Sequence, residues 1–213
     1  YQGCQVTVAT NGKDSVYGTG VDNCGTVPAS LVTFLALQKL RCSSETTTTT
    51  TPDLVLNAGT CGGFKRKGAA IGSVYLTSAV ANHDRRIPIP PFVPYGIGKL
   101  ESIGAPNLVE AYPNEFGTGV CTTGNSLDCT DEDDKRMEDN DATCKDMEAA
   151  AIAWSCKLFD TPYLGIKVVT DIVDGDKPTQ EEFMENLASA AKSLQEALPK
   201  VIQHVCGKTM NEL

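Results

Sequence analysis

Apolar and polar residues follow one another in blocks along the chain, and the blocks alternate between strand-like and helix-like spacing. Strand-like runs occupy 4–10, 54–59, 71–81, 116–123 and 163–169. Apolar residues recur at helical spacing in 26–40, 146–158 and 178–205. The runs at 54–59 and 163–169 are almost wholly apolar, which is typical of strands covered on both faces. The pattern predicts an α/β fold with a mixed or parallel central sheet flanked by helices.

Prolines and low-complexity sequence divide these blocks. The prolines of segment 83–96 predict neither a helix nor a central strand there. Pro178 suits the first turn of the last helix, and Pro199 is expected to break that helix. The threonine-rich segment 42–52 predicts a polar loop, and the acidic segment 131–143 a solvated face or a short helix. We expect a single domain over residues 1–213.

Composition excludes several classes of protein. A net charge of −9 argues against a nucleic acid or an anionic membrane surface as partner. No apolar run approaches the roughly 20 residues that span a bilayer. Nine cysteines without a C-x-x-C motif favour a reduced intracellular protein over a disulfide scaffold. We expect it in the cytoplasm or, after removal of a targeting peptide, in an organelle. The chain has only two histidines, which argues against a Ser-His-Asp triad and against a multi-histidine metal site. We expect no metal and no cofactor.

Two carboxylates carry the candidate chemistry. Three segments that follow strands, 59–63, 124–128 and 170–176, should converge beyond the carboxyl ends of the sheet. Glu148 begins a helix, where an ionised carboxylate is favoured and can bind a vicinal diol. Asp171 follows an apolar run, so partial desolvation should raise its pKa and suit it to donate a proton. The alternatives are a plain helix-start charge at Glu148, a turn cap at Asp171, and a tight turn without a ligand at 59–63.

Five motifs together resemble a known family. They are GTCGGF, HDRRIPIP, TTGNSLD, KDMEAAAIA and VTDIVDGDKPTQEEF, in this order. The chain is similar, from about residue 6 to residue 205, to the nucleoside phosphorylase and nucleosidase superfamily, and most of all to plant-type 5′-methylthioadenosine nucleosidases. The resemblance implies a three-layer fold with a mixed central sheet. It also implies hydrolysis of the N-glycosidic bond of 5′-methylthioadenosine, and of S-adenosylhomocysteine as a further substrate, by a homodimer or a subunit of a larger assembly.

The resemblance assigns roles around the ribose and the scissile bond. Asp171 would protonate the five-membered ring of adenine and make it a neutral leaving group. Glu148 would hold the ribose hydroxyls, and Met147 would pack against the sugar. Thr60 and Gly62 would lie near the ribose and the incoming water.

The resemblance also assigns the base pocket and its surroundings. Leu127 and Asp128 would frame the adenine, partly through backbone contacts. The proline-rich segment with Phe92 would help to wall the alkylthio pocket. For the charged run at 83–86 we expect internal or interface pairing rather than phosphate binding.

The chain departs from the family pattern in several places. Asn125, Ser73 and Ala149 stand where the family has Asp, Asp and Gly. No A-M-x-x-E-A strand, whose glutamate activates water in the family, occurs in residues 1–12. The expectation is that the first strands are missing, so that the chain is a fragment or has lost hydrolysis. The alternatives to a nucleosidase are therefore a catalytically impaired homologue, serving as a structural subunit or storage protein, and a phosphorylase of the same fold.

Overall fold

A mixed six-stranded sheet forms the centre of the molecule. The structure, a computed structural model, describes residues 3–42 and 51–213. The strands follow the order β3-β2-β4-β5-β1-β6, and β6 also pairs with β2, so five strands form a closed ring. The predicted α/β fold with a mixed sheet is confirmed. The strands are β1 (Val55–Gly63), β2 (Val74–Asn82), β3 (Leu100–Glu101), β4 (Phe116–Thr123), β5 (Ala142–Asp146) and β6 (Tyr163–Ile172).

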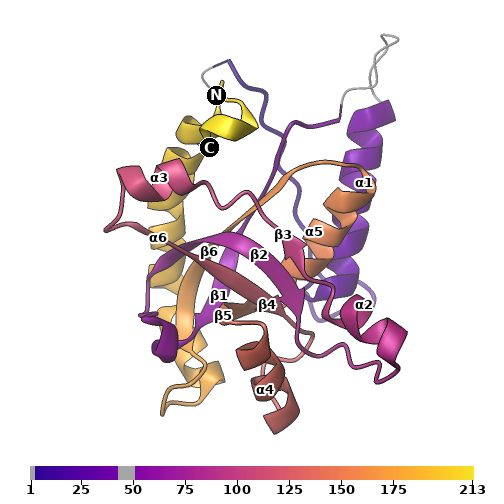
Figure 1. Ribbon diagram of the computed structural model, residues 1–213, viewed down its shortest axis with the longest axis vertical. Coiled ribbons are helices and arrows are strands. Elements are labelled where there is room, and N and C mark those ends of the chain that lie inside the picture. The colour runs from indigo at the N-terminus through magenta and orange to yellow at the C-terminus, as the bar shows by residue number, and fades with distance from the viewer. Residues whose placement is uncertain (1–2, 43–50) are drawn as a thin grey trace.

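Helices cover the sheet on two sides (Figure 1). On one side α5 (Ala149–Leu158) packs on the sheet and α1 (Thr26–Cys42) packs on α5. On the other side α6 (Thr179–Val205) lies along β6 and β1. The shorter helices are α2 (Val93–Ile97), α3 (Pro106–Ala111) and α4 (Asp131–Asp139), with 3₁₀ turns η1 (Lys65–Lys67), η2 (Pro90–Phe92) and η3 (Met210–Glu212).

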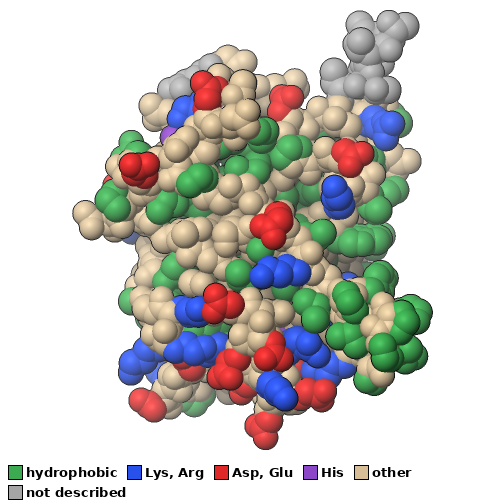
Figure 2. Space-filling model, in the orientation of Figure 1, with side chains coloured by type: hydrophobic (Ala, Val, Ile, Leu, Met, Phe, Trp, Pro, Cys, Tyr) green, Lys and Arg blue, Asp and Glu red, His purple; other side chains and the backbone are tan. Residues whose placement is uncertain are grey.

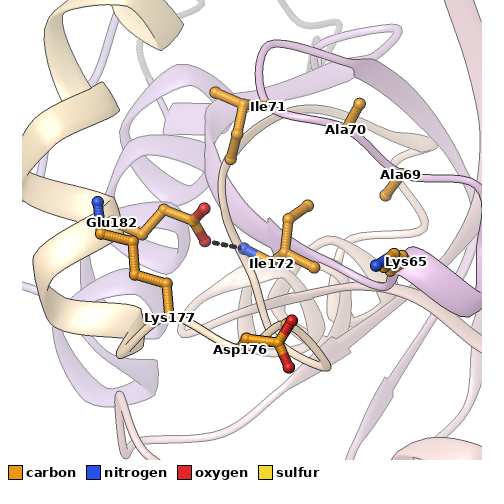
Figure 3. Close-up of a pocket in the computed structure, with 9 residues that line it drawn as sticks. Lys65, Ala69, Ala70, Ile71, Ile172, Asp176, Lys177 and Glu182 are labelled. Atoms are coloured by element: carbon orange, nitrogen blue, oxygen red, sulfur yellow. Dashed lines mark hydrogen bonds between the residues drawn. The ribbon is translucent and has the colours of Figure 1, made fainter.

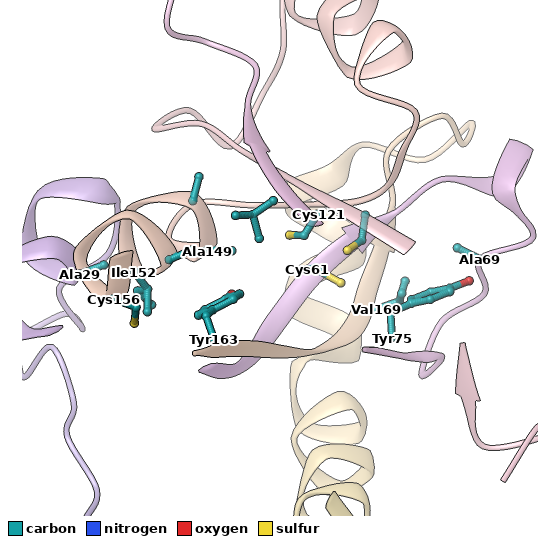
Figure 4. Close-up of a cluster of buried hydrophobic side chains, with 14 of the residues drawn as sticks. Ala29, Cys61, Ala69, Tyr75, Cys121, Ala149, Ile152, Cys156, Tyr163 and Val169 are labelled. Carbon is teal, nitrogen blue, oxygen red and sulfur yellow. The ribbon is translucent and has the colours of Figure 1, made fainter. Parts of the chain in front are cut away.

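Two apolar clusters fill the space between these layers. The first lies between the sheet and the α5 side, and Figure 4 shows that it contains the thiols of Cys61, Cys121 and Cys156. The second lies between the sheet and α6 and includes Ile166 and Val201. The cysteines of the first cluster are buried, so they act as small hydrophobic side chains.

Two predictions about strands are wrong. Segment 4–10 is not a strand. Its side chains are mostly exposed, and its backbone pairs with no strand in the described part of the chain. Conversely, the strand β5 is not predicted, because its sequence ATCKD has no apolar alternation and lies between the acidic segment 131–143 and the helix expected from residue 146. Its five residues are nevertheless all buried, so tertiary pairing with β4 and β1 decides its conformation.

Two predictions about prolines are also wrong. The proline-rich segment contains the short helix α2, which has a proline in its first turn, where no intrahelical N–H is needed. Pro199 lies inside α6 and does not end it. Ala197 and Val201 on either side are buried, and their packing offsets the lost hydrogen bond. Of the predicted loop 42–52, residues 43–50 lie outside the described residues.

A buried ion pair joins the sheet to α5. The Lys167 Nζ on β6 lies 2.8 Å from Asp146 Oδ2, and both side chains are almost inaccessible. Thr123 Oγ1 on β4 donates to Asp146 Oδ1 at 2.6 Å. The Ala149 N–H at the start of α5 donates to Asp146 Oδ2 at 2.8 Å. One carboxylate thus connects three strands and a helix.

We predict that Asp146→Asn destabilises the fold by about 3 kcal/mol, because it leaves the Lys167 ammonium buried without its counter-charge. Asparagine keeps an oxygen of similar size, so the loss reports the charge. Urea denaturation measures the change. Asp141→Asn is the matched control, since Asp141 pairs with Lys67 at the surface, where removing an ion pair costs about 1 kcal/mol or less. Equal losses in the two variants would contradict the prediction.

Candidate active site

Paired residues on four strands form one row that includes two of the predicted site residues, Gly62 and Asp171. Thr122 on β4 pairs with Lys145 on β5, which pairs with Gly62 on β1, which pairs with Asp171 on β6. Each of these residues is the last but one of its strand, so the row lies at the ends of all four strands, although β5 runs antiparallel to β1. The segment 59–63 is part of β1 rather than a loop, and Asp171 lies within β6 rather than beyond it.

A β-bulge aims the carboxyl group of Asp171. Cys61 pairs with Val169 and Gly62 pairs with Asp171, so Thr170 is the extra residue. Its hydroxyl lies 2.7 Å from Asp171 Oδ1 and 3.1 Å from the Cys61 carbonyl oxygen. A bulge of this kind redirects a side chain at the end of a strand.

Gly62 leaves the space that this carboxyl group occupies. A Cβ at position 62 would lie 2.7 Å from Asp171 Oδ2 and 2.7 Å from Val173 Cγ2, which is too close for any side chain. Gly62 is therefore required next to the predicted proton donor.

Burial dominates the electrostatics of Asp171. The residue is 3% exposed, and desolvation raises the pKa of its carboxyl group. The hydroxyl of Thr170 lowers this pKa, the negative charge of Glu182 raises it, and the ammonium of Lys145 lowers it. A carboxyl group that holds its proton at higher pH is suited to general acid catalysis.

Lys145 connects this row to the backbone of Leu127 and Asp128. Its Nζ donates to the Leu127 carbonyl at 2.8 Å and to the Asp128 carbonyl at 2.9 Å. The side chains of Leu127 and Asp128 are exposed, so they face the row through their backbone. Lys145 was not among the predicted site residues because β5 was not predicted. A lysine directly before Asp-Met-Glu is the signal that could have found it.

Glu148 lies at the start of α5, as predicted, but its carboxylate faces another helix. Its Oε1 accepts a hydrogen bond of 2.7 Å from the Gly25 N–H, just before α1. Burial raises the pKa of Glu148 and the charge of Asp146 adds to this, whereas the Gly25 N–H and Lys167 lower it. Met147 and Thr60 are partly buried. Thr60 pairs with Val168, between the levels of Lys167 and Asp171 along β6.

The loop that begins at Gly124 rests on buried and charged groups. A Cβ at Gly124 would lie 2.2 Å from Nε2 of the buried His83, so only glycine fits there. Asp84 Oδ2 accepts from the Asn125 N–H at 2.6 Å, and Arg86 forms an ion pair with Asp133. The prediction of internal pairing in this charged run is confirmed.

A hollow of about 460 Å³ adjoins the row but does not coincide with it (Figure 3). Its lining includes Ile172, Lys177 and Glu182, and none of the predicted site residues. Glu182 Oε2 accepts from the Ile172 N–H at 2.7 Å, which fixes the backbone beside Asp171.

Residues 3–42 and 51–213 contain neither a cluster of metal-ligating side chains nor a helix suited to cross a membrane. No three His, Cys, Asp or Glu side chains in these ranges gather as a metal site. No helix in the same ranges is long and apolar enough to cross a membrane.

Comparison with known proteins assigns the family. The model of the Phosphorylase superfamily matches residues 1–203. The chain belongs to this superfamily. It is 45% identical over 213 residues to a 5′-methylthioadenosine/S-adenosylhomocysteine nucleosidase of Arabidopsis thaliana, covering 100% of this chain and 78% of the relative. A 5′-methylthioadenosine nucleosidase of the same plant is 44% identical over 98% of this chain and 73% of the relative.

Solved structures agree with this assignment. Arabidopsis thaliana 5′-methylthioadenosine nucleosidase in apo form superposes with a TM-score of 0.84 at 46% identity, over 95% of this chain and 77% of that chain. A nucleosidase of Neisseria meningitidis has a TM-score of 0.67 at 23% identity, over 85% of this chain and 78% of that chain, and shows the shared fold.

We predict that Asp171→Asn stabilises the protein at neutral pH. The folded-state pKa of Asp171 is raised above its ordinary value of 3.8. The folded wild type therefore binds more protons than the unfolded chain between these two pKa values, and its stability falls as pH rises through that window. The advantage of the variant should vanish as pH is lowered to 3.8 and below.

Urea denaturation at a series of pH values measures this difference. Asp22→Asn is the control, since Asp22 is exposed at the surface and its loss should change stability little at any pH. An Asp171→Asn variant that is less stable than wild type at pH 8 would contradict the assignment of burial as the main influence on Asp171.

Proposed function

We propose that this chain hydrolyses the N-glycosidic bond of 5′-methylthioadenosine, with S-adenosylhomocysteine as a further substrate. The buried carboxyl group of Asp171 carries this proposal, because burial raises its pKa, which favours proton donation, and because it lies beside Gly62 in the row that Lys145 connects to the 127–128 backbone. The names of the two Arabidopsis thaliana relatives support the choice of substrate.

Asp171 acts as general acid on the base. It donates its proton to the five-membered ring of adenine while the bond to the ribose carbon breaks, so adenine leaves as a neutral molecule. The sugar passes through an oxocarbenium-like state, and water adds to the same carbon to give 5-methylthioribose. Asp171 is left as a buried carboxylate, which desolvation disfavours and which therefore readily recovers a proton.

Glu148 binds the sugar. A carboxylate accepts hydrogen bonds from two neighbouring hydroxyls, and its negative charge also favours the positive charge that develops on the ribose. Met147 packs against the sugar, and Thr60 and Gly62 lie beside the ribose and the water. Lys145 holds the carbonyl groups of residues 127 and 128, which frame the adenine.

Incubation of the chain with 5′-methylthioadenosine tests the proposal. We expect release of adenine and free 5-methylthioribose at a rate that does not depend on inorganic phosphate. A phosphate-dependent rate with a sugar 1-phosphate product would identify a phosphorylase. Binding without adenine release would identify a catalytically impaired homologue, and either result would overturn the proposal.

We predict that Asp171→Asn lowers kcat by about 10²–10⁴-fold, the usual contribution of general acid catalysis. KM should change little, because asparagine can still bind the base. Glu148→Gln should chiefly raise KM, because a neutral amide binds the ribose hydroxyls less well. Steady-state adenine release measures both variants, and similar changes in kcat and KM for the two would contradict the division of roles.

We also propose that the chain forms a homodimer through the α1 side of the molecule. Leu31 and Leu35 on α1 are 57% and 59% exposed, and Trp154 on the neighbouring α5 is 47% exposed. Figure 2 shows hydrophobic side chains gathered along α1 and over α2. An exposed apolar face of this kind is typical of an interface between proteins, and the occupant we propose is a second copy of this chain.

We predict that Leu35→Glu converts the dimer to a monomer, because it places a charge in the apolar interface. Sedimentation velocity over a range of concentrations measures the state. Met184→Glu is the matched control, since Met184 is 71% exposed on α6, on the opposite side of the molecule. A wild-type chain that stays monomeric at micromolar concentration would refute the proposed dimer.

A further inference from the structure

We infer that Asn125 is a positioning residue for the ribose-binding carboxylate of Glu148, acting through the start of α1. This inference rests on the proposed function. Asn125 does not contact Glu148 directly. It binds Thr26, the residue that follows Gly25, and the Gly25 N–H donates the hydrogen bond to Glu148.

Asn125 anchors the first residue of α1. Its Oδ1 accepts a hydrogen bond of 2.9 Å from the Thr26 N–H and another of 2.9 Å from Thr26 Oγ1. An amide oxygen has two lone pairs, so one side chain satisfies both donors. The Thr26 N–H lies at a helix N-terminus, where it has no acceptor within its own helix.

The residue before Thr26 contacts Glu148. Gly25 N donates to Glu148 Oε1 at 2.7 Å. Because residues 25 and 26 are consecutive, a fixed Thr26 also fixes the direction of the Gly25 N–H. Gly25 has a φ of +94°, which glycine adopts readily, and a Cβ there would lie 3.1 Å from Asn125 Oδ1. The segment is therefore packed closely against Asn125.

The chemistry of position 125 explains why an amide serves here. Asp84 Oδ2 accepts from the Asn125 N–H at 2.6 Å, so one carboxylate already lies next to this residue. An aspartate at position 125 would add a second negative charge near Asp84 and in the same network as Glu148. Asparagine supplies the acceptor oxygen without that charge. An asparagine in place of the aspartate expected from the family pattern thus keeps the acceptor for Thr26 and avoids repulsion from Asp84.

The consequence for the ribose is geometric. The Gly25 N–H holds one carboxylate oxygen of Glu148 and leaves the other to the sugar hydroxyls. Without Asn125, Gly25 and Thr26 would lose their fixed direction, and Glu148 would reach the ribose with a less defined orientation. The expected loss is therefore in ribose binding and should depend on the charge of Glu148.

A comparison of four proteins tests the inference: wild type, Asn125→Ala, Glu148→Gln and the double variant. For 5′-methylthioadenosine we expect Asn125→Ala to raise KM about 10-fold, as expected for one hydrogen bond to a charged group. In the Glu148→Gln background the same change should raise KM less than about twofold, because coupled residues are not additive. Asn125→Asp keeps the acceptor oxygen and should remain within about threefold of wild type.

The controls separate positioning from folding. Asn107→Ala removes a comparable bond, from Asn107 Nδ2 to the Glu212 carbonyl, far from the site, and should leave KM unchanged. Thermal unfolding shows whether each variant folds. If Asn125→Ala does not fold, Thr26→Ala removes one of the two hydrogen bonds of the same link, that from Thr26 Oγ1, and should raise KM only while Glu148 keeps its carboxylate. A 10-fold rise in KM in both backgrounds, or no rise in either, would overturn the inference.

Calorimetric affinity for 5′-methylthioadenosine distinguishes failure of the inference from failure of the proposed function. A wild type that binds the nucleoside but releases no adenine overturns the proposed hydrolysis, and the affinities of the variants then decide the role of Asn125. A wild type that releases adenine, with unchanged affinity in Asn125→Ala, overturns the inference alone. A wild type with no affinity for the nucleoside overturns both.

Discussion

The rest of the structure depends on the buried carboxylate of Asp146. It neutralises Lys167, which is buried in the middle of β6, and it accepts hydrogen bonds from β4 and from the start of α5. A buried ammonium without a counter-charge would be strongly destabilising, so β5 and β6 can share one core only in this arrangement. The same contact fixes where β5 ends and α5 begins. Met147 and Glu148 lie in that short junction, and their position follows from the ion pair.

Glycines then decide how closely the elements of the site approach one another. A side chain at position 62 would collide with Asp171, and one at position 124 would collide with His83. Gly25 combines a left-handed backbone with a close approach to Asn125. Each glycine removes a Cβ where two polar groups from distant parts of the sequence must meet. The geometry of the site therefore depends on these glycines as much as on the carboxylates.

The sequence predicted the elements whose apolar pattern matches their burial. The run 116–123 is β4 with the same bounds, and 163–169 is the larger part of β6. The prediction of elements from the apolar pattern failed where tertiary contacts override local preference. The five residues of β5 include a lysine and an aspartate. Their burial is favourable because Lys145 binds the Leu127 and Asp128 carbonyl groups of a loop and Asp146 binds Lys167 on β6. The positions of Asp171 near the end of a strand and of Glu148 at the start of a helix were predictable from the sequence. Lys145 and the link from Asn125 to Gly25 were not, because they join residues far apart in the sequence.

Two carboxyl groups with pKa values raised by burial are assigned different roles, and their surroundings account for the difference. Asp171 is 3% exposed, and the charge of Glu182 raises its pKa further. Glu148 is only partly buried, and both the Gly25 N–H and Lys167 favour its ionised form. Surroundings that give two carboxyl groups different pKa values are a general way of distinguishing a proton donor from a charged binding group. This difference agrees with the roles we propose, in which Asp171 donates a proton to the leaving base and Glu148 binds the sugar. The difference between the two pKa values depends on α1. Without the Gly25 N–H, the surroundings of Glu148 would be more similar to those of Asp171.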